Sequence, residues 1–130
     1  MAMGIKDLLA AAAAEIESIP AADLVASHGS EDVVFVDIRD PREIERDGSI
    51  PGAFRCTRGM LEFWIDPDSP YHKPVFAEAK RFVFFCAIGW RSSLATQTAK
   101  RMGVAGAVDL GGGLKAWRAA GGPVEVPPPR

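Results

Sequence analysis

The residues with the clearest chemical potential surround a single cysteine at position 86. Cys86 directly follows the apolar run 82–85, which has the composition of a buried β-strand. It precedes a short loop that leads into a predicted helix and consists of Ala87, Ile88, Gly89, Trp90, Arg91 and Ser92. Amides and the dipole at a helix N-terminus favour a thiolate, and the Arg91 guanidinium would add to this effect. We therefore hypothesise a reactive cysteine, with a buried structural cysteine as the alternative.

Two arginines and a second cysteine belong to another predicted strand end. Arg55 and Arg58 lie at the carboxyl end of the predicted strand 53–56. They would draw anions toward Cys86, although solvated arginines are the more ordinary interpretation. Cys56 is interpreted as a packed core thiol rather than as a redox partner of Cys86. The two histidines lie far apart and no Cys-x-x-Cys pattern occurs, so we expect no metal site.

Length and composition favour one soluble globular domain. The chain has 130 residues, of which 48% are apolar and 25% charged. Its formal net charge of −2 gives no general attraction to nucleic acid or to an anionic membrane, so we expect neither as a partner. Two cysteines are too few for a disulfide framework, which favours a reducing compartment.

The alanine-rich segment 8–14 has the hydrophobicity of a signal peptide, but its flanks do not fit one. Asp7 precedes the segment, Glu15 and Glu17 follow it, and a basic leader is lacking. The segment is better interpreted as part of an amphipathic helix. Since no run of about 18 apolar residues occurs, we expect no membrane span and a cytoplasmic location.

Helical and strand patterns alternate along the chain. We predict helices at 5–16, 20–29, 41–46, 60–65, 75–80, 92–102 and 114–120, and strands at 33–36, 53–56, 82–86 and 107–110. Residues 1–15 are expected as an N-terminal helix, 16–126 as the main domain, and 127–130 as an extended tail. Such alternation predicts a mostly parallel sheet, which binds ligands at the carboxyl ends of its strands.

Four motifs in a fixed order resemble the rhodanese homology domain. They are Val-Asp-Ile-Arg at 36–39, Ile-Pro-Gly-Ala at 50–53, the cysteine loop at 86–92, and Gly-Gly-Leu-Lys-Ala-Trp at 112–117. The similarity runs from about residue 16 to residue 126. It implies a three-layer α/β domain with a central, five-stranded, mostly parallel sheet, helices on both faces, and an active loop from Cys86 to Arg91.

The same resemblance implies a thiosulfate sulfurtransferase that works without a cofactor. The Cys86 thiolate would take sulfur from a small anionic donor such as thiosulfate and pass it, as a persulfide, to cyanide or a thiol acceptor. Asp37 and Arg39 would brace neighbouring loops, with a surface ion pair as the alternative. Arg91 would either brace the loop through its carbonyls or contact the substrate directly. Trp90 would shield the site or be a plain surface aromatic.

Several departures from the family pattern affect the functional interpretation. Ser49 stands where the family commonly has histidine, which leaves the local packing in question. Ile88 narrows the entrance of the loop, and the insert 57–74 would shape that entrance further. Related phosphatases and arsenate reductases carry one residue more between cysteine and arginine, which disfavours those activities. A non-catalytic binding or regulatory module is the second hypothesis, and the intact Cys86 argues against it.

Overall fold

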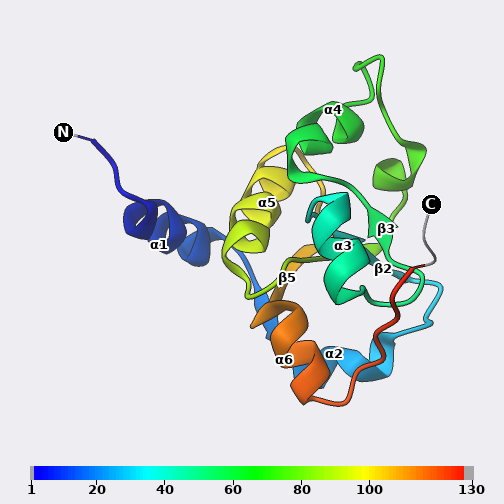
Figure 1. Cartoon of the computed structure of the whole chain (residues 1–130). Coiled ribbons are helices and arrows are strands. Elements are labelled where there is room, and N and C mark those ends of the chain that lie inside the picture. Colours follow the sequence, from blue (N-terminus) through cyan, green and yellow to red (C-terminus); the bar gives the residue numbers. More distant parts are fainter. Residues whose placement is uncertain (1, 128–130) are drawn as a thin grey trace.

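A five-stranded parallel sheet forms the centre of the computed structural model, which describes residues 2–127 (Figure 1). The strands lie in the order β1-β5-β4-β2-β3, and every neighbouring pair is parallel. Their bounds are β1 Ser18–Pro20, β2 Val33–Asp37, β3 Phe54–Arg55, β4 Arg81–Phe85 and β5 Ala107–Gly111. The predicted α/β class with a five-stranded sheet is confirmed.

Helices cover both faces of this sheet, as the alternating pattern predicts. They are α1 Ile5–Glu15, α2 Ala21–Leu24, α3 Pro41–Asp47, α4 Leu61–Ile65, α5 Trp90–Arg101 and α6 Gly113–Ala119. Single 3₁₀ turns occur at η1 Val25–Ser27, η2 Arg58–Met60 and η3 Pro74–Ala77. Figure 1 shows α2 and α6 together on one side of the sheet, with α4 and α5 on the other.

Strand β4 divides the core into two parts, because successive side chains of a strand point to opposite faces. Phe82 and Phe84 pack with α4 and α5, whereas Val83 and Phe85 pack with α2 and α6. These four side chains are at most 1% exposed. The unbroken apolar run in the sequence therefore reflects a strand that is buried on both faces.

The first strand of the sheet in chain order was absent from the sequence prediction. Residues Ser18–Pro20 form β1, an edge strand that pairs only with β5. Proline is tolerated at a sheet edge because it need not donate a ladder hydrogen bond. In the sequence, Pro20 looks like the first residue of a helix, and that helix begins one residue later, at Ala21.

Three predicted boundaries are corrected by the structure. The predicted helix 75–80 is a single 3₁₀ turn at Pro74–Ala77, and the predicted strand 53–56 is reduced to the two residues of β3. Helix α5 begins at Trp90 rather than at Ser92, so the active loop is shorter than expected. The tail expected at 127–130 lies, from residue 128 onward, outside the described residues.

Helix α1 extends away from the rest of the molecule and contacts it through α5 (Figure 1). Glu15 accepts hydrogen bonds from Gln97 and Arg101 of α5. Ala12 is the residue of α1 that is buried, so the expected apolar face is covered only in part. Across residues 2–127, no helix combines the length and the hydrophobicity that crossing a membrane requires.

Candidate active site

Cys86 is the first residue after β4, and its loop closes on the start of α5. The Gly89 amide donates a hydrogen bond to Cys86 Sγ at 3.2 Å. Gly89 has a φ of +106° and is the N-cap of α5, a conformation that L side chains rarely adopt. The side chain of Cys86 is only 1% exposed and packs in the apolar cluster on the α5 face of the sheet, so its sulfur is buried. The predicted arrangement of strand, loop and helix around Cys86 is present.

The outer side of the loop is fixed by the N-terminus of α6. The amides of Leu114 and Lys115 donate to the carbonyls of Cys86 (2.9 Å) and Ala87 (3.1 Å). A Cβ atom at Gly113 would lie 2.6 Å from the Ala87 carbonyl oxygen, so only glycine allows this close approach. The Gly-Gly segment before α6 therefore positions the active loop through backbone contact.

Arg91 forms a bidentate ion pair with Glu43 of α3. Its two terminal nitrogens donate to the two carboxylate oxygens at 2.6 and 2.8 Å. The hydrogen bonds from Arg91 lower the pKa of Glu43 to about 2, and the carboxylate raises the pKa of Arg91. Loop carbonyls or substrate were the predicted partners of Arg91, whereas the structure places the Glu43 carboxylate there. Arg91 therefore ties the start of α5 to α3.

Asp37 and Arg39 form a buried ion pair beside the loop that follows α3. Arg39 Nε and Nη2 donate to the Asp37 carboxylate at 2.9 and 2.8 Å, and Nη2 also donates to the Gly48 carbonyl. Both residues are at most 1% exposed, so the alternative of a surface pair is wrong. Ser49 stands where the family commonly has histidine, and its hydroxyl donates a hydrogen bond to the Asp37 carboxylate at 2.7 Å. Serine at this position therefore has a hydrogen-bond partner.

A buried carboxylate lies on the α5 side of the sheet, and the sequence analysis did not identify it. Asp109 of β5 is 3% exposed. It accepts hydrogen bonds from the hydroxyls of Ser92 (2.6 Å), Ser18 (3.1 Å) and Ser93 (3.3 Å). Burial raises the pKa of Asp109. The one available signal was a carboxylate inside an apolar strand, because such a group needs partners when it is buried.

Three predicted residues near β3 are not part of this arrangement. Cys56 is fully buried, and desolvation raises the pKa of its thiol to about 12, in agreement with a packed core thiol. Arg58 pairs with Glu62 at 2.8 Å and donates to Thr98, and Arg55 is exposed. The predicted rim residues Ile88 and Trp90 are 54% and 59% exposed.

A groove of about 390 Å³ lies beside the active loop. Ala87 and Ile88 form its loop side, and α6 contributes two basic residues, Lys115 and Arg118. Arg118 donates a hydrogen bond to the Asp47 carbonyl across this groove. The groove therefore joins an apolar loop surface to a wall where the two basic residues of α6 outnumber the one acidic residue, Asp47.

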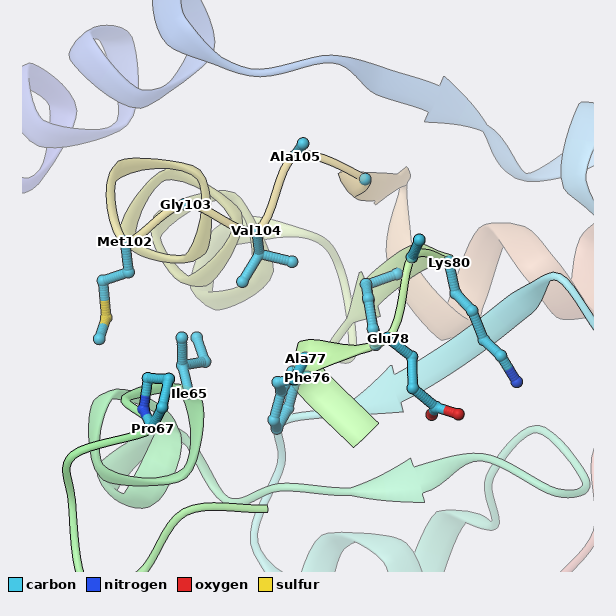
Figure 2. Close-up of a pocket in the computed structure, with 13 residues that line it drawn as sticks. Ile65, Pro67, Phe76, Ala77, Glu78, Lys80, Met102, Gly103, Val104 and Ala105 are labelled. Atoms are coloured by element: carbon cyan, nitrogen blue, oxygen red, sulfur yellow. The ribbon is translucent and has the colours of Figure 1, made fainter. Parts of the chain in front are cut away.

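A second cavity, of about 350 Å³, lies at the opposite end of the sheet (Figure 2). Figure 2 shows Ile65, Phe76 and Val104 around it, with Met102 at one side. Its walls come from segments that precede β4 and β5, whereas Cys86 follows β4. This cavity is therefore remote from the cysteine loop.

Comparison with known proteins supports one family. The family model described as the rhodanese-like domain matches residues 20–120. A sulfurtransferase of Allochromatium vinosum is 31% identical, over 75% of this chain and 83% of that protein. The mouse thiosulfate sulfurtransferase/rhodanese-like domain-containing protein 3 is 30% identical over 68% of this chain, which spans 59% of the mouse protein.

Among solved structures, a Rhodopseudomonas palustris protein is similar over nearly its whole length. It is 60% identical, with a TM-score of 0.93 and 96% of each chain covered. It is described as a protein of unknown function and a possible tyrosine phosphatase. The curated relatives support a sulfurtransferase-type enzyme. The description of the Rhodopseudomonas palustris protein makes phosphatase activity the alternative to test.

Proposed function

Because the chain belongs to the rhodanese-like domain family, we propose that it transfers sulfane sulfur through a persulfide on Cys86. The observation that carries the proposal is the position of Cys86 Sγ, 3.2 Å from the Gly89 amide at the first turn of α5. An amide donor and a helix N-terminus favour negative charge on sulfur, both in the thiolate and in the persulfide.

In the first half-reaction, the Cys86 thiolate attacks the outer sulfur of thiosulfate. A new S–S bond forms to Cys86, the S–S bond of thiosulfate breaks, and its electron pair leaves with sulfite. The persulfide keeps one negative charge on its terminal sulfur, and the helix N-terminus next to Sγ, where the Gly89 amide donates, favours that charge. No general acid is needed, because sulfite leaves as a stable anion.

In the second half-reaction, cyanide or a thiolate attacks the terminal sulfur of the persulfide. The bond between this sulfur and Cys86 breaks, and its electron pair returns to Cys86 as the thiolate. The products are thiocyanate or the persulfide of the acceptor. Because Cys86 is 1% exposed, we expect it to react with small donors and acceptors that present a terminal reactive atom.

The groove beside the loop suits anionic substrates. Lys115 and Arg118 line it together with Ile88, so an anion is attracted to the side of the active loop. Thiosulfate is a small dianion, which suits a buried sulfur beside a groove lined by the two basic residues of α6. We expect neither nucleic acid nor membrane lipid as a partner.

The contacts of Arg91 argue against phosphatase chemistry. A phosphatase of this type would need the guanidinium to bind the substrate phosphate, whereas Arg91 is engaged by Glu43 at 2.6 and 2.8 Å. The loop also has one residue fewer between Cys86 and Arg91 than the phosphatases have. Both features favour a sulfur atom over a tetrahedral oxyanion.

Whole-protein mass spectrometry after incubation with thiosulfate tests the proposal. We expect one added sulfur, which peptide mapping assigns to Cys86, and turnover of thiosulfate with cyanide. The Cys86→Ser variant should lose both, and the matched Cys56→Ser variant should keep both. Unchanged turnover in Cys86→Ser, or no added sulfur with several sulfane donors, would reject the proposal. The second result would favour a binding module, and aryl phosphate turnover dependent on Cys86 would favour a phosphatase.

We also propose a cytoplasmic location. Cys56 and Cys86 are both free thiols, and a reducing compartment keeps them so. Immunoblotting of cell fractions would test this location, and a signal outside the cytoplasmic fraction would contradict it.

A further inference from the structure

A continuous line of hydrogen bonds connects Cys86 to the buried carboxylate of Asp109. Cys86 Sγ lies 3.5 Å from Ser92 Oγ, and Ser92 Oγ lies 2.6 Å from Asp109 Oδ1. The three residues come from the end of β4, the first turn of α5 and the centre of β5. Each of them is at most 3% exposed. This arrangement shields the line from bulk water.

The direction of these bonds follows from the number of hydrogens. Ser92 has one hydroxyl hydrogen, and its short distance to Asp109 shows that the carboxylate accepts it. The oxygen of Ser92 therefore presents a lone pair to Cys86, and the thiol is the donor in the contact at 3.5 Å. We propose that Asp109 accepts the proton of Cys86 through Ser92 and so generates the thiolate within the protein.

The proton transfer balances without any outside reactant. The S–H bond of Cys86 breaks as its proton forms an O–H bond to Ser92, while the original Ser92 proton forms an O–H bond to Asp109. Afterwards the neutral Asp109 donates to Ser92, and Ser92 donates to the thiolate. Ser18 continues to donate to the other Asp109 oxygen, Oδ2, and the hydroxyl hydrogen of Ser93 is shared between Oδ2 at 3.3 Å and the Gly89 carbonyl at 2.8 Å.

The surroundings of the two groups favour this movement of charge. Around Asp109, the neighbouring elements β1 and α5 provide the neutral hydroxyls of Ser18, Ser92 and Ser93, and burial raises the pKa of Asp109. Around Cys86, the Gly89 amide donates to the sulfur, and Arg91 carries a positive charge that interacts with it. Glu43 of α3 partly offsets Arg91 through their ion pair.

Two coupled groups that share one proton titrate in two macroscopic steps. Below the lower step, both Cys86 and Asp109 are protonated and the sulfur is unreactive. Between the two steps the pair holds one proton, and a fixed fraction of Cys86 is thiolate whatever the pH. Above the upper step all of Cys86 is thiolate. The rate of Cys86 alkylation by iodoacetamide should therefore rise, reach a plateau, and rise again.

The Asp109→Asn variant distinguishes this role from a purely structural one. Asparagine keeps an oxygen that accepts from Ser92 but cannot take a proton. We expect a single alkylation step between the two wild-type steps, with the rate falling about tenfold per pH unit below it. Ser18→Ala removes a donor to the carboxylate and should move the lower step to higher pH. Asp68→Asn, an equal charge change on an exposed loop, should leave both steps in place.

A measurement on Asp109 itself keeps the proposal testable if Asp109→Asn fails to fold. The carboxyl ¹³C shift of Asp109 should show two steps against pH in the wild type and one step in Cys86→Ser. Identical alkylation profiles for wild type and Asp109→Asn, or one-step titration of Asp109 in the wild type, would overturn the proposal.

The inference depends on the proposed function only in taking Cys86 as the working thiolate. Alkylation needs no sulfur transfer, so the two proposals fail separately. Two-step alkylation without any persulfide would reject the sulfurtransferase function alone. Persulfide formation with one-step alkylation would reject the role of Asp109 alone.

Discussion

Replacing Gly113 by alanine tests whether α6 positions the active loop. Gly113 has a φ of +67°, and an added Cβ would lie 2.6 Å from the Ala87 oxygen and 2.7 Å from the Ile88 nitrogen. These are backbone atoms of the loop, and no flexible side chain can move aside to relieve the contact. The substitution therefore forces the loop away from α6, although it removes no functional group from the protein.

The size of the effect follows from two contributions. A left-handed conformation costs a non-glycine residue about 1–2 kcal/mol. Displacing the loop also weakens the hydrogen bonds from Leu114 to Cys86 and from Lys115 to Ala87, each worth about 1 kcal/mol. We expect Gly113→Ala to lower the free energy of unfolding by about 3–4 kcal/mol.

Gly52→Ala is the matched control for this substitution. Gly52 has a φ of +80°, but nothing lies within 4 Å of its added Cβ, so only the backbone strain remains. Urea unfolding of the two variants should therefore differ by about 2 kcal/mol, and Cys86 should be alkylated at an altered rate only in Gly113→Ala. Equal stability losses within about 0.5 kcal/mol would refute the positioning role of α6.

Three further predictions concern buried charge, pH and thiol reactivity. Asp37→Asn leaves the 1% exposed Arg39 without its charged partner and should cost about 3–5 kcal/mol in urea unfolding, so a loss below about 1 kcal/mol would contradict this. The lowered pKa of Glu43 stabilises the fold above pH 4.5, and this stability is lost as pH falls toward 2. The melting temperature of Glu43→Gln should therefore not decline over this pH range. In the wild type the decline corresponds to a loss of about 1–2 kcal/mol in the free energy of unfolding, because Arg91, the partner of Glu43, is half exposed. Near neutral pH, iodoacetamide should modify Cys86 before Cys56, whose pKa is about 12; equal rates would argue against an activated thiol.

The sequence predicted those features of the fold that depend on local pattern. The apolar runs predicted β2, β4 and β5, and Asp40 with Pro41 predicted the start of α3, where the Asp40 side chain accepts from two backbone amides. Strand β1 has no such pattern, because a three-residue edge strand is defined by its partner β5. Its proline instead favoured a helix start.

The candidate site was predictable only where it is contiguous in the chain. Cys86 and its loop form one motif, so their placement followed from the strand and the helix on either side. The partner of Arg91 lies 48 positions away at Glu43, and no spacing rule relates them. Asp109 likewise accepts hydrogen bonds from Ser18 and Ser92, which are distant in the sequence and become its neighbours only in the folded sheet.

The order of the strands also affects how the chain folds during synthesis. Strand β5, the last in chain order among the strands within residues 2–127, lies between β1 and β4. Until it emerges, β1 has no partner and β4 has one unpaired edge, which is the kind of surface that joins neighbouring chains. A nascent chain stalled before residue 107 therefore exposes an incomplete sheet, and β1 can join the other strands only after β5 has emerged.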